Sequence, residues 1–131
     1  MSAAGGLCDH ALMARTVVIV DDHAGFRAEA ARLLESAGYE VVGSCADGHS
    51  AVVAIAELRP DVVLLDVQLP DTDGFRLMAQ ITVGAGGPTV VLTSSREAAD
   101  YGARVGMSGA AGFITKAELS ARSLAQVVAP R

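Results

Sequence analysis

Short runs of β-branched and aliphatic residues alternate along the chain with segments of helical periodicity. The runs that we expect to form strands are Thr16–Val20, Tyr39–Gly43, Val62–Leu65, Thr89–Leu92 and Gly112–Thr115. The segments that we expect to form helices are Gly25–Ala37, Ser50–Leu58, Gly74–Ile81, Glu97–Val105 and Glu118–Val128. Continuous apolar runs of about 4–8 residues are typical of strands buried on both faces. This alternation predicts a mostly parallel sheet with helices on both faces.

The length of 131 residues decides between the two architectures that such an alternation permits. A closed barrel of eight strand–helix units typically needs about 250 residues, whereas a single domain has roughly 100–200. We therefore expect one α/β domain with an open, doubly wound sheet in residues 15–131. Residues 1–14 are small and rich in Gly and Ala, without clear periodicity, and we expect a flexible N-terminal tail there.

Charge and cysteine content narrow the classes of protein. A net charge of −5 argues against a nucleic-acid-binding surface, which needs a basic stripe, and against binding to anionic membranes. Cys8 and Cys45 are too few and too far apart for a disulfide framework or a zinc site, and they fit a reducing compartment. No apolar run approaches the ~18 residues of a membrane-spanning helix, and the N-terminus lacks a secretory signal pattern. We expect a cytoplasmic protein.

Polar residues stand at the ends of four of the five predicted strands. The first strand is followed by Asp21-Asp22, the third by Asp66, the fourth by Thr93-Ser94 and the fifth by Lys116. In an open doubly wound sheet, ligands bind outside the carboxyl ends of the strands. Clustered carboxylates repel one another unless a cation is present, and oxygen ligands suit a hard ion such as Mg²⁺. The pattern predicts an acidic, magnesium-binding crevice.

Each of these residues also has a purely structural interpretation. A carboxylate after a strand, such as Asp22, is often the N-cap of the next helix. Thr93 alone is typical of a turn or capping hydroxyl, and Lys116 alone is typical of a solvated surface charge. The joint placement of all of them at strand ends is what favours a functional site.

These motifs carry a family resemblance. Asp21-Asp22 after VVIV, Asp66 in LLDVQLPDTDGF, Thr93 in VVLTSS and Lys116 in GFITK resemble the receiver domain of two-component response regulators. The resemblance spans residues 14–129. It implies a flavodoxin-like, five-stranded parallel sheet of order 2-1-3-4-5 with five helices. The DDH start and the GFITKAEL ending are most similar to receivers of the nitrate-regulator type.

The resemblance implies a phosphoacceptor and its metal site. Asp66 would be the nucleophile that takes a phosphoryl group to give an aspartyl phosphate. Asp22 and Asp66 would ligate Mg²⁺ directly, Asp21 would act through water, and the Gln68 backbone carbonyl would complete the protein ligands.

The resemblance also implies a switch. Lys116 and Thr93 would contact the phosphoryl oxygens, and Phe113 would be the aromatic residue that moves with Thr93. One position departs from the family pattern, because Ala117 follows Lys116 where receivers commonly have proline. A cis peptide before a residue other than proline costs about 2.5–4 kcal/mol, so we expect a trans bond at Lys116–Ala117.

The implied partners are a sensor histidine kinase or a phosphotransfer protein, which would donate the phosphoryl group. The domain would not be an enzyme acting on other substrates, although it would assist its own phosphorylation and dephosphorylation. It would control an output domain or a partner, with homodimer formation on phosphorylation as one route. We expect these residues to bind neither nucleic acid nor a membrane.

Three alternatives remain. Asp71-Thr-Asp73 resembles the Asp-x-Asp motif of haloacid-dehalogenase-like phosphatases, but it follows Pro70 and a loop rather than a buried strand. A nucleotide-binding module would need a glycine-rich phosphate cradle after the first strand, where this chain has DDHAGF. A receiver that has lost its chemistry and serves only for protein interaction is a third alternative, which Mg²⁺ binding would distinguish.

Overall fold

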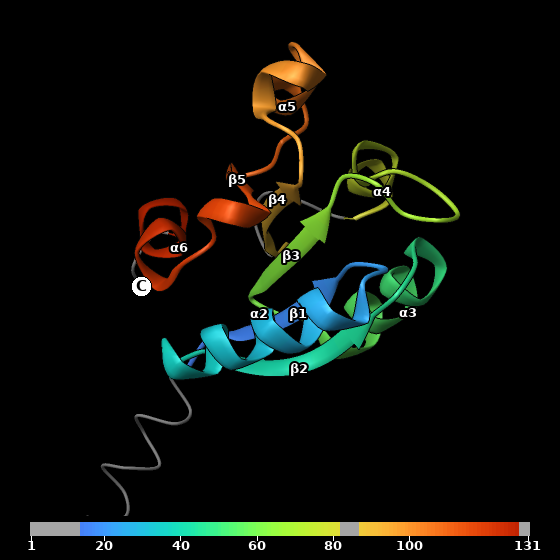
Figure 1. Cartoon of the computed structure of the whole chain (residues 1–131). Coiled ribbons are helices and arrows are strands. Elements are labelled where there is room, and N and C mark those ends of the chain that lie inside the picture. Colours follow the sequence, from blue (N-terminus) through green and yellow to red (C-terminus); the bar gives the residue numbers. More distant parts are fainter. Residues whose placement is uncertain (1–13, 82–86, 129–131) are drawn as a thin grey trace, which may run out of the picture.

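The computed structural model describes residues 14–81 and 87–128, and its centre is a five-stranded parallel sheet (Figure 1). The strands are β1 Thr16–Val20, β2 Glu40–Cys45, β3 Val62–Asp66, β4 Thr89–Ser94 and β5 Gly112–Thr115. Their order is β2-β1-β3-β4-β5, and every neighbouring pair is parallel. The order reverses between β1 and β3, which places a topological switch point beside the ends of these two strands. The predicted fold class and strand order are confirmed.

Helices cover both faces of this sheet (Figure 1). In the described part of the chain they are α2 Ala24–Ser36, α3 Gly48–Leu58, α4 Gly74–Gln80, α5 Arg104–Met107 and α6 Ala121–Val127, with 3₁₀ turns η1 Ala98–Tyr101 and η2 Lys116–Glu118. One buried cluster joins the sheet to α3 and α4, and the other joins it to α2 and α6. No helix in this described part is both long and apolar enough to cross a lipid bilayer.

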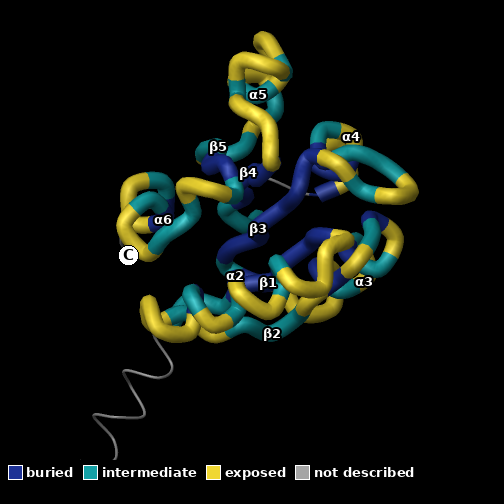
Figure 2. Tube along the Cα trace, viewed as in Figure 1, coloured by how far each residue is buried: buried dark blue, intermediate teal, exposed yellow. Residues whose placement is uncertain are grey.

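The central strands are buried over almost their whole length, because alternate side chains pack on opposite faces of the sheet. Val18 and Val20 of β1 pack toward α3, whereas Val17 and Ile19 pack toward α2. Every residue of β3 is buried, as the continuous dark tube in Figure 2 shows. Full burial of one such aliphatic side chain contributes about 1.5–3 kcal/mol, so the two clusters hold the strand ends in fixed positions.

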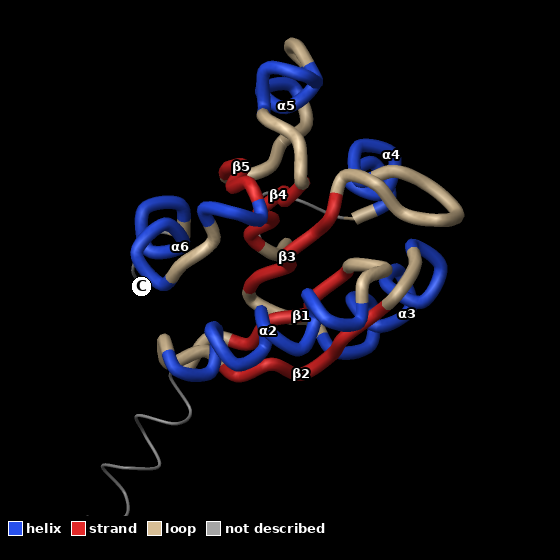
Figure 3. Tube along the Cα trace, in the orientation of Figure 1, coloured by secondary structure: helices blue, strands red, loops and turns tan. Residues whose placement is uncertain are grey.

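The predicted helix over Glu97–Val105 is wrong in detail, since two short elements replace it (Figure 3). The side chains and backbone amides of Glu97 and Asp100 bond reciprocally and close the tight turn η1. Gly102 then has a φ of 61°, a left-handed conformation that ends the turn. The α5 helix is a separate single turn that begins at Arg104.

The predicted start of the last helix at Glu118 is also wrong. Residues Lys116–Glu118 form η2, and α6 begins after the N-cap residue Ser120. The Ser120 hydroxyl accepts a hydrogen bond from Ser123 N at 3.0 Å, and Ser120 N donates one to Ser123 Oγ at 2.9 Å. This reciprocal cap fixes the helix start at Ala121, three residues later than the periodicity indicated.

One prediction falls mainly outside the described residues. It is the flexible tail over residues 1–14, of which only Ala14 is described.

Candidate functional site

Asp21 is buried directly after β1 because its backbone continues the sheet. Asp21 N donates to the Cys45 carbonyl at 3.0 Å, which extends the pairing of β1 with β2. Asp21 Oδ1 accepts a hydrogen bond from His23 N at 2.8 Å, and Arg27 Nη1 donates to the Asp21 carbonyl at 2.6 Å. Asp21 is 1% exposed, whereas the side chain of Asp22 is 44% exposed. The acidic pair therefore offers one fixed carboxylate and one that reaches solvent.

Asp66 and Thr93 lie side by side on neighbouring strands. Both strands run further than predicted, and Asp66 of β3 is the register partner of Thr93 of β4. Val67 N donates to the Thr93 carbonyl at 2.9 Å and prolongs this ladder. Both side chains are buried, and the Thr93 hydroxyl has no hydrogen-bond partner among the described residues. A buried donor without a partner is costly, so this hydroxyl is available to a ligand.

Lys116 joins the ends of β1, β3 and β5. Its Nζ lies 2.8 Å from Asp21 Oδ2 and 3.2 Å from Asp66 Oδ2. The same ammonium lies 4.7 Å from the centre of the Phe26 ring, which belongs to α2. One positive charge thus serves two buried carboxylates and rests on an aromatic face. The Lys116–Ala117 peptide is trans, as predicted, since the described residues contain no cis bond.

The site shifts the protonation equilibria of Asp66 and Lys116. Burial, with a smaller contribution from the Asp21 carboxylate, raises the pKa of Asp66 to about 6, although the Gln68 amide and Lys116 act against it. Burial acts to lower the pKa of Lys116, but its contacts with Asp21 and Asp66 outweigh this and raise the pKa. Lys116 therefore stays protonated, whereas the ionised form of Asp66 is only partly stabilised by its surroundings.

This charge balance fits a divalent cation. Asp21, Asp22 and His23 each offer a ligand atom within 4.8 Å of the others. The carboxylate of Asp66 lies near this group, because the Lys116 ammonium contacts both Asp21 and Asp66. Three carboxylates with a single ammonium leave negative charge that a hard, oxygen-seeking ion would neutralise. His23, for which the sequence indicated no role, lies beside these carboxylates with its Nδ1 3.5 Å from Asp22 Oδ1.

The chain after Asp66 turns tightly and requires glycine at position 74. Gly74 N donates to the Val67 carbonyl at 2.6 Å. A Cβ atom at Gly74 would lie 2.9 Å from the Asp66 carbonyl oxygen and 3.0 Å from Val67 Cα. Any larger residue would therefore displace the backbone that carries Asp66.

The carboxylates of the Asp71-Thr-Asp73 motif accept hydrogen bonds from backbone amides at the starts of two helices. Asp73 accepts a hydrogen bond from Arg76 N at 2.9 Å as the N-cap of α4. Asp71 accepts hydrogen bonds from two amides of the first turn of α3. These contacts give both carboxylates a structural role, which removes the basis for the phosphatase alternative.

Phe113 belongs to a small aromatic cluster. Its ring centre lies 6.0 Å from that of Tyr101, and the Tyr101 ring lies edge-on to Phe75 at 5.6 Å. The Tyr101 hydroxyl is 2.6 Å from Ser94 Oγ, one residue after Thr93. Nothing in the sequence indicated that Tyr101 contacts Phe113, because Tyr101 lies in the segment Glu97–Val105, where a single helix was wrongly predicted.

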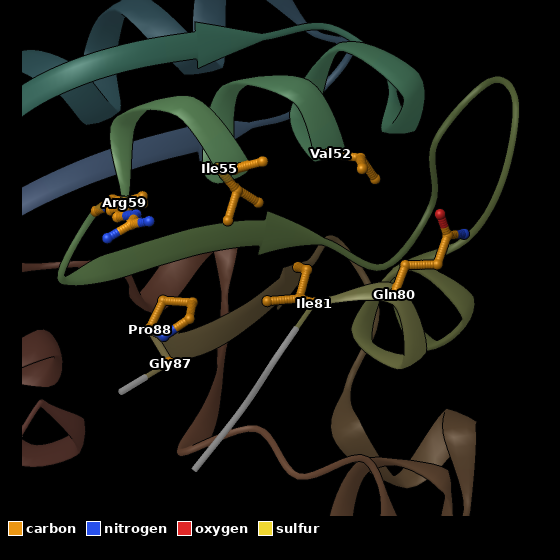
Figure 4. A pocket seen from close by; sticks show the side chains of 9 residues that line it. Val52, Ile55, Arg59, Gln80, Ile81, Gly87 and Pro88 are labelled. Atoms are coloured by element: carbon orange, nitrogen blue, oxygen red, sulfur yellow. The ribbon is translucent and has the colours of Figure 1, made fainter. Parts of the chain in front are cut away.

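A separate hollow of about 310 Å³ lies at the opposite ends of the strands. Figure 4 shows Val52 and Ile55 of α3 on one side of it, with Ile81 and Pro88 on the other. Pro88 immediately precedes β4, so the hollow is near the amino ends of the strands, away from the acidic site. None of the site residues described above lines it.

The chain is thus an open parallel α/β domain with a buried carboxylate at the end of its central strand and a lysine beside it. The chain belongs to the response regulator receiver domain family, whose model matches residues 17–129. Receiver domains are regulatory units that are phosphorylated in two-component signalling.

Individual relatives agree with this membership. The chain is 37% identical over 107 residues to the transcriptional regulatory protein PdtaR of Mycobacterium tuberculosis, a match that covers 81% of the chain and 51% of PdtaR. It resembles the solved receiver domain of NarL from M. tuberculosis, with a TM-score of 0.74, 32% identity and coverage of 86% and 91% of the two chains. The chemotaxis regulator CheY4 of Vibrio cholerae, 24% identical, shares the fold with a TM-score of 0.77 over 88% of this chain and 100% of its own. The chain thus spans about half the length of PdtaR.

Proposed function

We propose that residues 15–131 form a phosphorylation-controlled switch in which Asp66 accepts the phosphoryl group. One observation carries this proposal: Asp66 is a buried carboxylate, 3.2 Å from the Lys116 ammonium and in register with Thr93, whose hydroxyl has no hydrogen-bond partner in the described part of the chain. Phosphoryl transfer requires a nucleophile, a positive charge and a hydrogen-bond donor close to one another.

The transfer uses one carboxylate oxygen of Asp66. This oxygen forms a bond to phosphorus while the bond between phosphorus and a histidine nitrogen of the donor breaks, and the bonding electron pair stays on that nitrogen. Lys116 offsets the negative charge of the phosphoryl oxygens, and Thr93 donates its hydroxyl hydrogen to one of them. Thr93 and Phe113 then form the moving part of the switch.

The acidic residues would hold Mg²⁺. Asp22 and Asp66 are the proposed direct carboxylate ligands, the Gln68 carbonyl is the third protein ligand, and Asp21 acts through water. When bound, the ion supplies positive charge opposite the phosphoryl oxygens. The excess of carboxylates over ammonium groups at this site supports the assignment.

The proposed donor is a sensor histidine kinase or a phosphotransfer protein of the cytoplasm. The switched surface would control an output domain or a separate partner, or would form a homodimer on phosphorylation. The match to part of a protein named a transcriptional regulator supports an output in transcription. With a net charge of −5, we do not expect these residues to contact DNA themselves.

Mass spectrometry of the intact protein tests the acceptor. Wild type, Asp66→Asn and the exposed-site control Asp100→Asn are incubated with acetyl phosphate and Mg²⁺. We expect one phosphoryl adduct on wild type and on Asp100→Asn, and none on Asp66→Asn. An adduct of undiminished yield on Asp66→Asn would exclude Asp66 as the acceptor.

A further inference from the structure

Asp71 connects the loop after Asp66 to the start of α3. Its Oδ1 accepts a hydrogen bond from Gly48 N at 2.8 Å, and its Oδ2 accepts one from His49 N at 3.0 Å. The partners are separated by 23 and 22 residues in the sequence. Both oxygens of one carboxylate thus bind consecutive amides of a helix N-terminus, where such groups favour negative charge. These hydrogen bonds, with that from Gly48 N foremost, lower the pKa of Asp71.

The α3 helix does not depend on Asp71 for its cap. Asp47 is the N-cap residue, and its Oδ1 accepts hydrogen bonds from Ser50 N at 2.8 Å and from Ser50 Oγ at 2.7 Å. A single side-chain cap of this kind is the usual arrangement at a helix start. The additional contacts of Asp71 therefore act mainly on the loop that carries Asp71, by holding it against the helix.

The approach of the loop to α3 is close enough to require glycine at position 48. A Cβ atom at Gly48 would overlap Thr72 Cγ2 and would lie 3.3 Å from Asp71 Oδ1. Gly48 is buried although the residues on either side of it are more exposed. The contact thus consists of two hydrogen bonds and direct packing of Thr72 on the helix.

Hydrogen bonds inside the loop connect Asp71 to the proposed metal ligand. Leu69 N donates to the Thr72 carbonyl at 3.1 Å, and Gln68 pairs with Asp73 as an antiparallel bridge. Gln68 N also donates to Asp66 Oδ1 at 3.1 Å. Residues 68–73 thus form a closed turn with Gln68 at its base, beside Asp66, and Asp71 at its tip.

We propose that Asp71 is a positioning residue for the metal site: by tethering the tip of the 68–73 turn to α3, it fixes the direction of the Gln68 carbonyl. The inference rests on the proposed function, because it takes Gln68 as a ligand of Mg²⁺. Groups that orient metal ligands without touching the metal typically change affinity by about 10–100-fold when removed.

The test compares Asp71→Ala with Asp47→Ala, a matched control. Both variants remove one negative charge and one carboxylate from the same helix N-terminus, but only Asp71→Ala frees the loop. We expect Asp71→Ala to bind Mn²⁺ roughly 10-fold more weakly than wild type in calorimetry, and Asp47→Ala to stay within about twofold. Hydrogen exchange at the Leu69 amide should accelerate in Asp71→Ala alone. Thermal unfolding of both variants verifies that they are folded.

Gly48→Ala tests the tether without any change of charge. The added methyl group would overlap Thr72 Cγ2 and lie 3.3 Å from Asp71 Oδ1, so these contacts must shift, and we expect a loss of Mn²⁺ affinity no larger than in Asp71→Ala, although every carboxylate remains. If Asp71→Ala binds Mn²⁺ as wild type does, the tether has no role in the metal site and the inference is wrong, whatever Gly48→Ala shows.

Asp22→Ala separates this outcome from a failure of the proposed function. It removes a proposed direct ligand, so weaker Mn²⁺ binding than in wild type would support the metal site independently of Asp71. Equal Mn²⁺ binding by wild type and Asp22→Ala would refute the metal site, and the role of Asp71 with it.

Discussion

The ammonium of Lys116 rests on the face of the Phe26 ring, 4.7 Å from its centre, while it also pairs with the carboxylates of Asp21 and Asp66. Phe26 lies in the first turn of α2 and packs on the cluster beneath that helix. The Lys116 side chain is only 19% exposed, which weakens competition from water. A cation–aromatic contact in such surroundings contributes about 1–2 kcal/mol. Phe26 therefore helps to hold the lysine over the site.

Replacement of Phe26 tests this contact. We expect Phe26→Leu to slow phosphorylation by acetyl phosphate roughly fivefold, which corresponds to about 1 kcal/mol, and Phe26→Tyr to keep the wild-type rate. The ring-current shift of the Lys116 ε-protons in NMR spectra should disappear in Phe26→Leu only. Phe75→Leu is the matched control, since it removes a similar contact with Arg104 at 4.4 Å. An unchanged Lys116 shift in Phe26→Leu would contradict the prediction.

The raised pKa of Asp66 predicts a pH-dependent stability. Its pKa of about 6 in the folded protein exceeds the ordinary value of 3.8. The folded state therefore binds the proton more tightly, so this stabilising contribution is complete below about pH 4 and is lost as the pH rises through about 6. We expect wild type to lose on the order of 2 kcal/mol relative to Asp66→Asn between pH 4.5 and pH 7.5.

Denaturant unfolding at these two pH values, in the presence of a chelator, measures this difference. Comparison with Asp66→Asn cancels the contributions of the other titrating groups. Parallel pH profiles of the two proteins would show that Asp66 has an ordinary pKa. Carboxyl resonances in ¹³C spectra give the pKa directly.

The sheet and most of the candidate site could be predicted because each depends on local sequence. A run such as Val62–Leu65 is apolar enough to specify a buried strand by itself. Parallel strands bring their carboxyl ends to one edge, so Asp66, Thr93 and Lys116 had to converge once the strands were assigned. The predicted strand ends were one or two residues short because Asp66 and Thr93 are polar but still paired in the ladder.

Other features could not be predicted because they depend on contacts between distant segments. The tether from Asp71 to Gly48 joins residues 23 apart, and no local pattern indicates it. Phe26 fits the apolar spacing of α2, which gives no sign that its face supports Lys116. The break in the segment Glu97–Val105 is a local exception: the reciprocal Glu97–Asp100 contacts and the positive φ of Gly102 end the turn η1, and the spacing of apolar residues does not indicate them.

Two glycines predict opposite effects of the same substitution. Gly74→Ala places a methyl group 2.9 Å from the Asp66 carbonyl oxygen, where backbone must move, and we expect a loss of about 1–3 kcal/mol. Gly25→Ala meets no atom within 4 Å and replaces a helical glycine, so we expect a gain of about 0.5–1 kcal/mol. Denaturant unfolding of both variants measures these changes. Equal stability of Gly74→Ala and wild type would show that the turn after Asp66 is less tight than described.

The Thr93 hydroxyl finds no hydrogen-bond partner within residues 14–81 and 87–128, which predicts that its removal stabilises the fold at the expense of function. Valine has nearly the same shape without a buried donor, so we expect Thr93→Val to raise the free energy of unfolding by about 1 kcal/mol. The same variant should still be phosphorylated on Asp66 but should lose the conformational response. Unfolding curves and amide spectra with beryllofluoride and Mg²⁺ measure the two effects. A variant less stable than wild type would indicate that the hydroxyl has a partner in solution.

The contact between Tyr101 and Ser94 provides a spectroscopic test of the switch. The chain has no tryptophan and two tyrosines, Tyr39 and Tyr101, so a Tyr39→Phe background leaves Tyr101 as the only strong emitter. When Thr93 moves toward the phosphoryl oxygens, Ser94 moves with it, and the 2.6 Å contact with the Tyr101 hydroxyl changes. We therefore expect beryllofluoride with Mg²⁺ to alter Tyr101 fluorescence in this background.

The free energy that the switch requires determines how large the Tyr101 fluorescence change can be when the Thr93 hydroxyl is removed. Phe113 contacts Tyr101 and is already partly buried, so its further burial on switching would contribute less than the ~1.5–3 kcal/mol of a complete burial. A change from 1:99 to 99:1 between two states requires about 5.5 kcal/mol, so the phosphate contacts of Thr93 and Lys116 must supply the remainder. In the Tyr39→Phe background, Thr93→Ala should therefore abolish most of the fluorescence change, although mass spectrometry should still detect phosphorylation of Asp66. A full fluorescence change in Thr93→Ala would mean that the phosphoryl group reaches Tyr101 and Phe113 by a route that does not involve the Thr93 hydroxyl.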